Sequence, residues 1–252
     1  LIEMGKKVQE YNSDMYLLNV DSNFLVTNLF RPYIMQLTGS PFVNDETKEL
    51  SCTKEQLQYV LEYIQSLYDN KVVQAAGETA SFEGAPQTNP KWINGENVCV
   101  MTNSSQINNL TDANPEAEYI VVAMPKMEDE SAQLNDGYYA SPPQLMCVNK
   151  NSDHIEEAIM FLDYFYNNEE AALILKDLRS RELCTENGLI NDLVTSAVNI
   201  AIDKNGVNEM GLTTDSEIEA VIKTMIESVS YGESSAEDAT SKGINMLEDI
   251  LS

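Results

Sequence analysis

Histidine is nearly absent from this chain: His154 is the only one in 252 residues. One histidine cannot complete a zinc cage, and a Ser-His-Asp triad would depend on this single position, which follows a predicted helix cap. We therefore expect His154 to lie at the surface. The sequence also lacks a phosphate-cradling glycine loop and a dinucleotide fingerprint, so it predicts neither a metal nor a cofactor.

Cysteines are few and widely spaced. The closest two of the four, Cys147 and Cys184, are 37 residues apart, a spacing that matches no metal-ligand motif. Cys99 and Cys147 lie inside apolar runs, where a free thiol behaves as a small hydrophobic side chain. We expect these two to be buried, while the disulfide state of the four stays open.

Basic residues and long apolar runs are also scarce. Asp and Glu outnumber Lys and Arg by 41 to 15, which gives a net charge of -26. Such a surface repels nucleic acid and anionic lipid head groups, and the sequence has no basic patch to offset this. No apolar stretch approaches the roughly 20 residues of a membrane span, and no signal peptide is visible. A nucleic-acid partner and direct membrane insertion are therefore not expected.

The first residues already show helical spacing of apolar side chains, over 1–8. No Ser, Thr, Asp or Asn precedes them to cap the free N–H groups of the first turn. Our interpretation is that the sequence starts inside a helix and is a fragment of a longer protein.

Strands and helices alternate in the first 150 residues. A buried strand is predicted over 15–20, an apolar helix over 24–37, and a hairpin over 42–52. Thr53 and Gln56 form a capping box that begins the next helix. Three further strands are predicted, over 98–102, 119–124 and 138–149, the last with its apolar part at 145–148. This alternation favours an α/β fold with crossover connections.

The chain from Ser152 onward shows helical periodicity almost throughout. Helices are predicted over 155–165, 168–175, 189–202, 216–229 and 236–251. By contrast, 74–90 is small, polar and proline-containing, which predicts a surface loop.

Aromatic and amide side chains follow several of the predicted strands. Trp92 could stack on a sugar, but its place in a short amphipathic helix before a glycine turn favours a core position. Tyr138 and Tyr139, after Gly137, can present ring faces and hydroxyls to a cleft, and ordinary interface packing is an equally open interpretation. The same two interpretations apply to Asn23 and Phe24, after the first strand.

Carboxylates do not discriminate between functions here. With 41 of them, some pair always has a separation suited to glycoside hydrolysis, so pairing says nothing about catalysis. The run 128–130 lacks the spaced oxygen ligands and the glycine of an EF-hand loop. We interpret it as a solvated surface.

Four passages carry a likeness to a known family. They are the helix over 1–8, the hairpin and helix over 42–73, the aromatic-x-x-Gly segment with its Met-ended strand over 92–106, and the Lys-x-Ser helix within 148–181. In this order they resemble family 1 of the extracellular solute-binding proteins of ABC importers, which includes maltose- and oligosaccharide-binding proteins. One departure is at 181–184, where the family usually has Arg-Gly-Ile/Val-Pro and the Gly and Pro are absent here.

The resemblance implies a periplasmic-binding-protein-like α/β fold of two lobes joined by a hinge. Residues 1–139 and 200–252 would form the C-terminal lobe, and 140–199 an incomplete part of the N-terminal lobe. The strand over 144–148 would then lack sheet partners, so that another chain supplies them or this region packs atypically. A lipid anchor on the missing N-terminal part would hold the protein at the outer face of the cell membrane.

The resemblance also implies a function without catalysis. The protein would be the substrate-binding component of an ABC transporter, closing by hinge motion over a sugar or oligosaccharide and delivering it to permease subunits. The loop 208–212, where the family supplies aromatic contacts, has no aromatic residue. The ligand-binding residues expected on this basis are Asp21, Ser22, Asn23, Phe24, Asn103, Ser104, Ser105, Gln106, Tyr138 and Tyr139. The alternatives are a glycosidase with paired carboxylates and a sensory or protein-interaction domain on the same fold.

Overall fold

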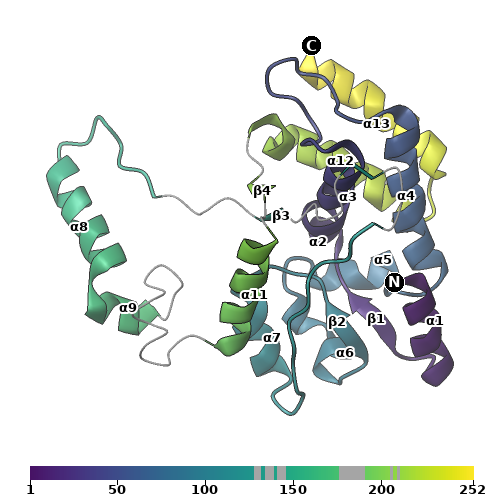
Figure 1. Cartoon of the computed structure of the whole chain (residues 1–252), viewed down its shortest axis with the longest axis horizontal. Coiled ribbons are helices and arrows are strands. Elements are labelled where there is room, and N and C mark those ends of the chain that lie inside the picture. The colour runs from purple at the N-terminus through teal and green to yellow at the C-terminus, as the bar shows by residue number, and fades with distance from the viewer. Residues whose placement is uncertain (128–131, 134–138, 141–145, 176–190, 205–206, 209–210) are drawn as a thin grey trace.

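The computed structural model describes residues 1–127, 132–133, 139–140, 146–175, 191–204, 207–208 and 211–252. Most described elements pack into one body around a small parallel sheet, whereas helices α8 and α9 stand apart from it (Figure 1). Within the described residues, no helix combines the length and the apolar composition that crossing a bilayer requires.

The central sheet is formed by β1 (Tyr16–Asn19) and β2 (Asn97–Val100), which pair in parallel. Leu18 faces Cys99 in the register and also forms a parallel bridge to Val73. Parallel neighbours require a crossover connection, because the chain must return to the same end before the second strand begins. The predicted α/β layering with crossovers is thus confirmed.

Helices fill the chain before, between and after these two strands. Helix α1 (Ile2–Tyr11) precedes β1, and its N-cap Leu1 makes no side-chain capping bond. The crossover contains α2 (Ser22–Leu25), the π-helical turn η1 (Val26–Phe30), α3 (Arg31–Thr38), α4 (Lys54–Asp69), α5 (Ala76–Thr79), the 3₁₀ turns η2 (Ala80–Phe82) and η3 (Pro86–Thr88), and α6 (Pro90–Ile93). After β2 come the 3₁₀ turn η4 (Ser104–Gln106) and α7 (Ile107–Ala113), and the chain closes with η6 (Gly211–Thr214), α12 (Ser216–Ser230) and α13 (Ala236–Leu251).

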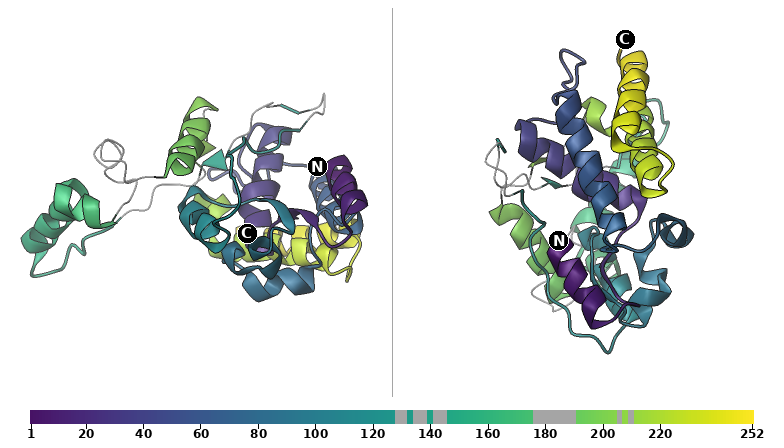
Figure 2. Two further views of the ribbon diagram at one scale, coloured as in Figure 1. Left: turned by 90° about the horizontal axis from the view of Figure 1, so that it is seen from below. Right: turned by 90° about the vertical axis from the view of Figure 1, so that its right-hand side faces the viewer.

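The core lies where α4 packs against the last two helices. Helix α4 begins at the predicted capping box, in which Thr53 Oγ1 accepts from the Gln56 N–H at 3.2 Å and Gln56 Oε1 accepts from the Thr53 N–H at 2.9 Å. Its apolar face is fully buried against α12 and α13, which lie alongside it (Figure 2). Burial of such a face, rather than helix propensity, supplies most of the stability of helices in proteins. The face consists of Leu57, Val60, Leu61, Ile64 and Leu67.

A buried arginine joins distant parts of this body. Arg31, 2% exposed, donates to the backbone oxygen of Thr213 at 3.0 Å and pairs with Glu219 on α12. The predicted hairpin over 42–52 is present as an antiparallel bridge between Val43 and Leu50.

A second pair of strands flanks the part of the chain that contains α8, α9 and α11. The short strands β3 (Tyr139–Ala140) and β4 (Val207–Asn208) pair in parallel. Between them lie α8 (Ile155–Asn167), α9 (Glu169–Leu175) and α11 (Asp192–Asp203), close to the predicted helices. Helices α8 and α9 pack on each other, and α11 packs against α7 and η4.

The strand predicted over 119–124 is wrong, and the one predicted over 138–149 is confirmed only at Tyr139–Ala140, which form β3. Residues 119–124 form no strand, and Ile120 is 84% exposed. Residues 146–148 have no regular structure, and Cys147, expected to be buried, is exposed. A β-branched or apolar run forms a strand only where a neighbouring strand pairs with it, and no described strand pairs with either segment. Leu145 lies outside the described residues.

Candidate functional site

Two of the predicted groups lie at one edge of the sheet. Because β1 and β2 are parallel, the residues after each strand emerge at the same, carboxyl end. The Met101 N–H donates to the Asn19 backbone oxygen at 3.2 Å, which continues the pairing to the end of the sheet. The predicted groups 21–24 and 103–106 therefore share the carboxyl edge, where open α/β sheets bind their ligands.

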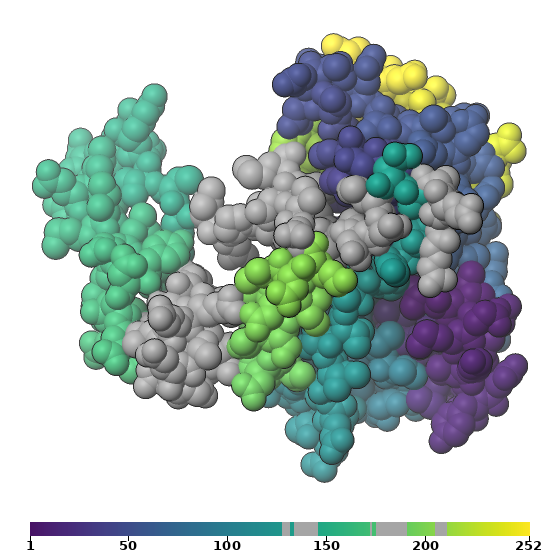
Figure 3. All heavy atoms as spheres, viewed as in Figure 1, coloured from purple at the N-terminus to yellow at the C-terminus, as the bar shows by residue number. Residues whose placement is uncertain are grey.

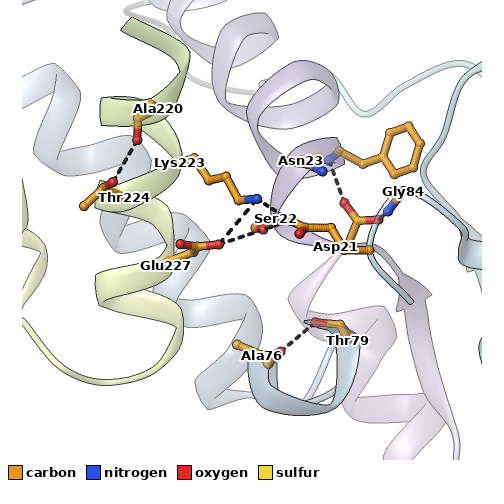
Figure 4. A network of polar contacts seen from close by, with 12 residues as sticks. Asp21, Ser22, Asn23, Ala76, Thr79, Gly84, Ala220, Lys223, Thr224 and Glu227 are labelled. Carbon is orange, nitrogen blue, oxygen red and sulfur yellow. Dashed lines mark hydrogen bonds and ion pairs between the residues drawn. The ribbon is translucent and has the colours of Figure 1, made fainter. Parts of the chain in front are cut away.

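Asp21 is enclosed by its own chain. Its carboxylate accepts from the Phe24 N–H at 3.0 Å, capping α2, and from the Gly84 N–H at 2.7 Å (Figure 4). The residue is only 3% exposed. Burial raises the pKa of Asp21 above its ordinary value, although the two N–H donors stabilise the ionised form. Asp21 thus fixes the turn after β1 against the segment at Gly84.

Ser22 is held by charged side chains from two other elements. Its hydroxyl lies within donating distance of Glu83 Oε1, at 2.6 Å, and of Glu227 Oε1, at 3.1 Å. Lys223 Nζ lies 2.6 Å from Glu83 Oε1 and 3.8 Å from Glu227 Oε1. Figure 4 shows Lys223 and Glu227 reaching from α12 toward Ser22.

The charges in this group stabilise one another. Burial acts to raise the pKa of Glu83, but bonds from Lys223 and Ser22 outweigh it and lower that pKa. Burial acts to lower the pKa of Lys223, but its bond to Glu83 and the nearby carboxylates raise that pKa. Both groups are therefore held in their ionised forms near neutral pH.

The last two residues of this turn differ in exposure. Asn23 is exposed, and its backbone oxygen accepts from the Thr27 hydroxyl at 3.2 Å. Phe24 is 7% exposed and belongs to the core. In the group 21–24, Asn23 is therefore the side chain most available to a solute.

The group after β2 is more open. Asn103 and Ser105 are exposed, and Ser104 and Gln106 are half-buried. The Gln106 N–H donates to the Asn103 backbone oxygen at 3.0 Å, forming η4, and Gln106 Oε1 accepts from Asn109 at 3.2 Å. This turn presents amides and hydroxyls, the groups that recognise sugar hydroxyls.

Helix α11 lies against this second group. It packs on η4 and α7, and Asn191, at its N-cap, donates to Asn108 Oδ1 at 3.2 Å. The space-filling view shows α11 seated beside the segment that contains α7 (Figure 3). The polar turn 103–106 thus faces a helix from the part of the chain between β3 and β4.

The remaining predicted residues are placed as follows. Tyr139 is in β3, paired with Val207 in β4. Tyr138, the acidic run 128–130 and the segment 181–184 lie outside the described residues. His154 is exposed at the start of α8, as predicted.

Trp92 is confirmed as a core residue. It is 5% exposed, its Nε1 donates to the Leu110 backbone oxygen at 3.0 Å, and its ring stacks on Tyr119 with centroids 5.7 Å apart. Both ring contacts are internal, so Trp92 anchors α7 behind the polar turn instead of offering a face to a sugar.

Sequence reasoning missed a buried cluster of amides. Asn89, fully buried, places its Nδ2 3.0 Å from Asn19 Oδ1 and 2.5 Å from Gln74 Oε1. Asn19 in turn donates to the Pro86 backbone oxygen at 3.0 Å. The prediction that 74–90 is a surface loop is therefore wrong in part, because its amides pair with one another and become buried. The one local signal was Asn89 before Pro90, which is typical of a helix cap.

Comparison with known proteins identifies the family. The model of the bacterial extracellular solute-binding proteins matches residues 1–180. A search of curated proteins gives no significant match. Among solved structures, an oligogalacturonide-binding protein from Yersinia enterocolitica, in complex with saturated digalacturonic acid, has 19% identity and a TM-score of 0.83, over 99% of this chain and 64% of that one.

Two further structures show the same fold. A family 1 extracellular solute-binding protein from Alicyclobacillus acidocaldarius has 18% identity and a TM-score of 0.74, over 99% of this chain and 63% of that one. A maltose/maltodextrin-binding domain from Bdellovibrio bacteriovorus, bound to maltotriose, has 18% identity and a TM-score of 0.66, over 99% of this chain and 65% of that one. The chain thus spans less than two thirds of the length of these structures. Because the family model covers more than half of its residues, the chain belongs to the bacterial extracellular solute-binding proteins.

Proposed function

We propose that this protein is the substrate-binding component of an ABC importer, which captures a sugar or oligosaccharide by hinge closure and delivers it to permease subunits. The observation that carries this proposal is the parallel pairing of β1 and β2, because Asn23 and the turn 103–106 follow the carboxyl ends of these two neighbouring strands. The sugar ligands named for two structural neighbours support the choice of solute. The family supports an extracellular location, and a lipid anchor at the outer face of the membrane is part of the proposal.

We assign residues 1–139 and 200–252 to one lobe and 140–199 to part of the other. The paired strands β3 and β4 lie where the chain would cross between lobes, and α8 and α9 stand apart from the body (Figure 1). Large apolar side chains on α8 are exposed, including Met160 at 71% and Phe161 at 60%. Such side chains support a role for α8 in a second lobe whose other elements would cover it.

The solute would lie where the two lobes face each other, near η4 and α11. Asn23, Asn103, Ser105 and Gln106 would donate to and accept from its hydroxyl groups, and Tyr138 and Tyr139 would supply ring faces. Asp21, Ser22 and Phe24 would contribute indirectly, by fixing the turn that carries Asn23. No bond is made or broken, so affinity depends on complementarity and on closure of the hinge.

The test is a thermal-shift titration with oligogalacturonides, maltodextrins and a free amino acid as an unlike solute. It uses residues 1–252 and, in parallel, the protein with whatever sequence precedes Leu1 in its gene. A solute at about 100 times its Kd is expected to stabilise the folded state by roughly 2.7 kcal/mol, seen as a higher Tm.

Two variants locate the site. Asn103→Ala and Gln106→Ala are expected to lose most of the shift, while Asn245→Ala, at an exposed position on α13, is expected to keep it. Release of reducing sugar would instead favour a glycosidase. A protein insensitive to every solute that co-purifies with a membrane partner would favour a sensory domain.

A further inference from the structure

Charged side chains from separate parts of the chain meet behind the turn after β1. We call Ser22, Glu83, Lys223 and Glu227 the Ser22 cluster. Ser22 begins α2, Glu83 directly follows η2, and Lys223 and Glu227 are four residues apart on α12. The side chains of Glu83, Lys223 and Glu227 are 31%, 30% and 39% exposed, so water only partly screens their charges.

The ammonium group of Lys223 interacts with several carboxylates in this cluster. Lys223 contacts Glu83 and Glu227 directly, and the buried carboxylate of Asp21 is close enough to act on its charge. Without Lys223, the Ser22 hydroxyl would lie between two carboxylates that repel each other. Its single proton can serve only one of them at a time.

The same cluster adjoins a backbone contact of the turn. Glu83 precedes Gly84, whose N–H donates to Asp21 at 2.7 Å, and Asp21 also accepts from the Phe24 N–H. Movement of Glu83 away from Glu227 would therefore draw Gly84 away from Asp21. The turn that presents Asn23 is thus linked to α12 through the Lys223–Glu83 ion pair and the bond from Gly84 to Asp21.

We infer that Lys223 is a positioning residue for the turn 21–24: by offsetting the repulsion between Glu83 and Glu227, it keeps Ser22 and Gly84 in place and fixes Asn23 at the sheet edge. The link to solute affinity rests on the proposed function. The link between Lys223 and the geometry of the turn does not rest on that function, and the two links are measured separately.

The first measurement is hydrogen exchange of the Phe24 and Gly84 amides by NMR. Lys223→Met is expected to speed both at least about 10-fold, since lost contacts open the turn locally. The Leu18 amide, which donates to Val72, reports on the sheet and should change much less. Lys242→Met, on the exposed side of α13, makes the same change in net charge and should leave all three amides unchanged.

Rescue variants distinguish the effect of losing the charge balance from the effect of losing the lysine side chain itself. Lys223→Arg keeps the positive charge, and Glu83→Gln combined with Lys223→Met removes one charge of each sign. Both are expected to return the Phe24 and Gly84 amides to within about 3-fold of the wild-type rate. If Lys223→Met proves too unstable to study, Lys223→Gln at lower temperature and the double variant decide the same question.

The second measurement is the Kd for the solute that gives the largest thermal shift. Lys223→Met is expected to weaken binding about 10-fold, and Lys242→Met to leave it unchanged. Unchanged exchange at Phe24 and Gly84, or equal acceleration at Leu18, would overturn the positioning role. Faster exchange with unchanged affinity would refute the link to binding while the proposed function stands. Absence of any solute binding in the wild type would refute the proposed function, and exchange would still decide the role of Lys223.

Discussion

Helices α12 and α8 have similar sequence patterns and opposite surroundings. Both place apolar residues at helical spacing, over Ser216–Ser230 and Ile155–Asn167. Six residues of α12 are buried between α4 and α13, whereas none of α8 is buried. The difference shows that periodicity identifies the apolar face of a helix and says nothing of what covers it.

This contrast extends to local stability. The body gains its stability from the packing of α4, α12 and α13, in which nearly every apolar side chain on the facing surfaces is buried. Among the described residues, α8 has α9 as its main neighbour. Segments with few buried contacts open at low free-energy cost, so α8 should unfold locally well before the body does.

The largest expected effect is on core packing. Ile222→Ala removes a fully buried side chain from α12 and should lower the free energy of unfolding by about 2–5 kcal/mol. Ile159→Ala, at a position on α8 that is 55% exposed, should change it by less than about 0.5 kcal/mol. Urea denaturation followed by circular dichroism measures both. Equal losses would show that the face of α8 is covered in solution.

Thiol reactivity is also expected to differ between the body and the region of α8. Cys99 in β2 donates to the Leu17 backbone oxygen, and burial raises the pKa of its thiol to about 11. Cys147, near α8, is exposed. At pH 8 iodoacetamide should label Cys147 at least about 100-fold faster than Cys99, because the thiolate is the reactive form.

Peptide mass spectrometry reads each site separately. The rate at Cys99 should rise as the pH approaches 11, where its thiol ionises, and the two rates should converge in urea. Similar rates in the native protein at pH 8 would mean that the edge of β2 opens far more readily than its burial indicates.

The smallest expected effect concerns helix caps. Thr53→Ala removes one bond of the α4 capping box and should cost about 1 kcal/mol. His154→Ala, at the N-cap of α8, removes a side chain that makes no capping bond and should cost less than about 0.5 kcal/mol. Thermal unfolding of both variants compares them, and equal losses would contradict the assigned capping geometry.

Local patterns predicted the helices well. The capping box at Thr53, the apolar face of α4 and the last two helices depend on interactions within a few residues, so the sequence shows them directly. The strand predicted over 119–124 depends on a partner elsewhere, which an apolar run does not specify. The exposed side chains of α8 follow the same rule.

The candidate site was predictable only in its location. That 21–24 and 103–106 would share an edge follows from a parallel pairing. That Asp21 and Phe24 would be buried does not, nor does the contact of Ser22 with Glu227, 205 residues later. The amide cluster around Asn89 joins segments 15 and 70 residues apart, and the cap signal of Asn89 before Pro90 does not reveal these partners.

The separation along the chain between α4 and its partners α12 and α13 has a consequence for biosynthesis. Helix α4 ends at Asp69, and α12, which packs on it together with α13, begins at Ser216, 147 residues later. At the usual rates of translation, roughly 7 to 30 seconds separate the appearance of the two. During that time the nascent chain exposes the part of the α4 surface that α12 and α13 later cover, and a chaperone that recognises exposed apolar helices can bind there.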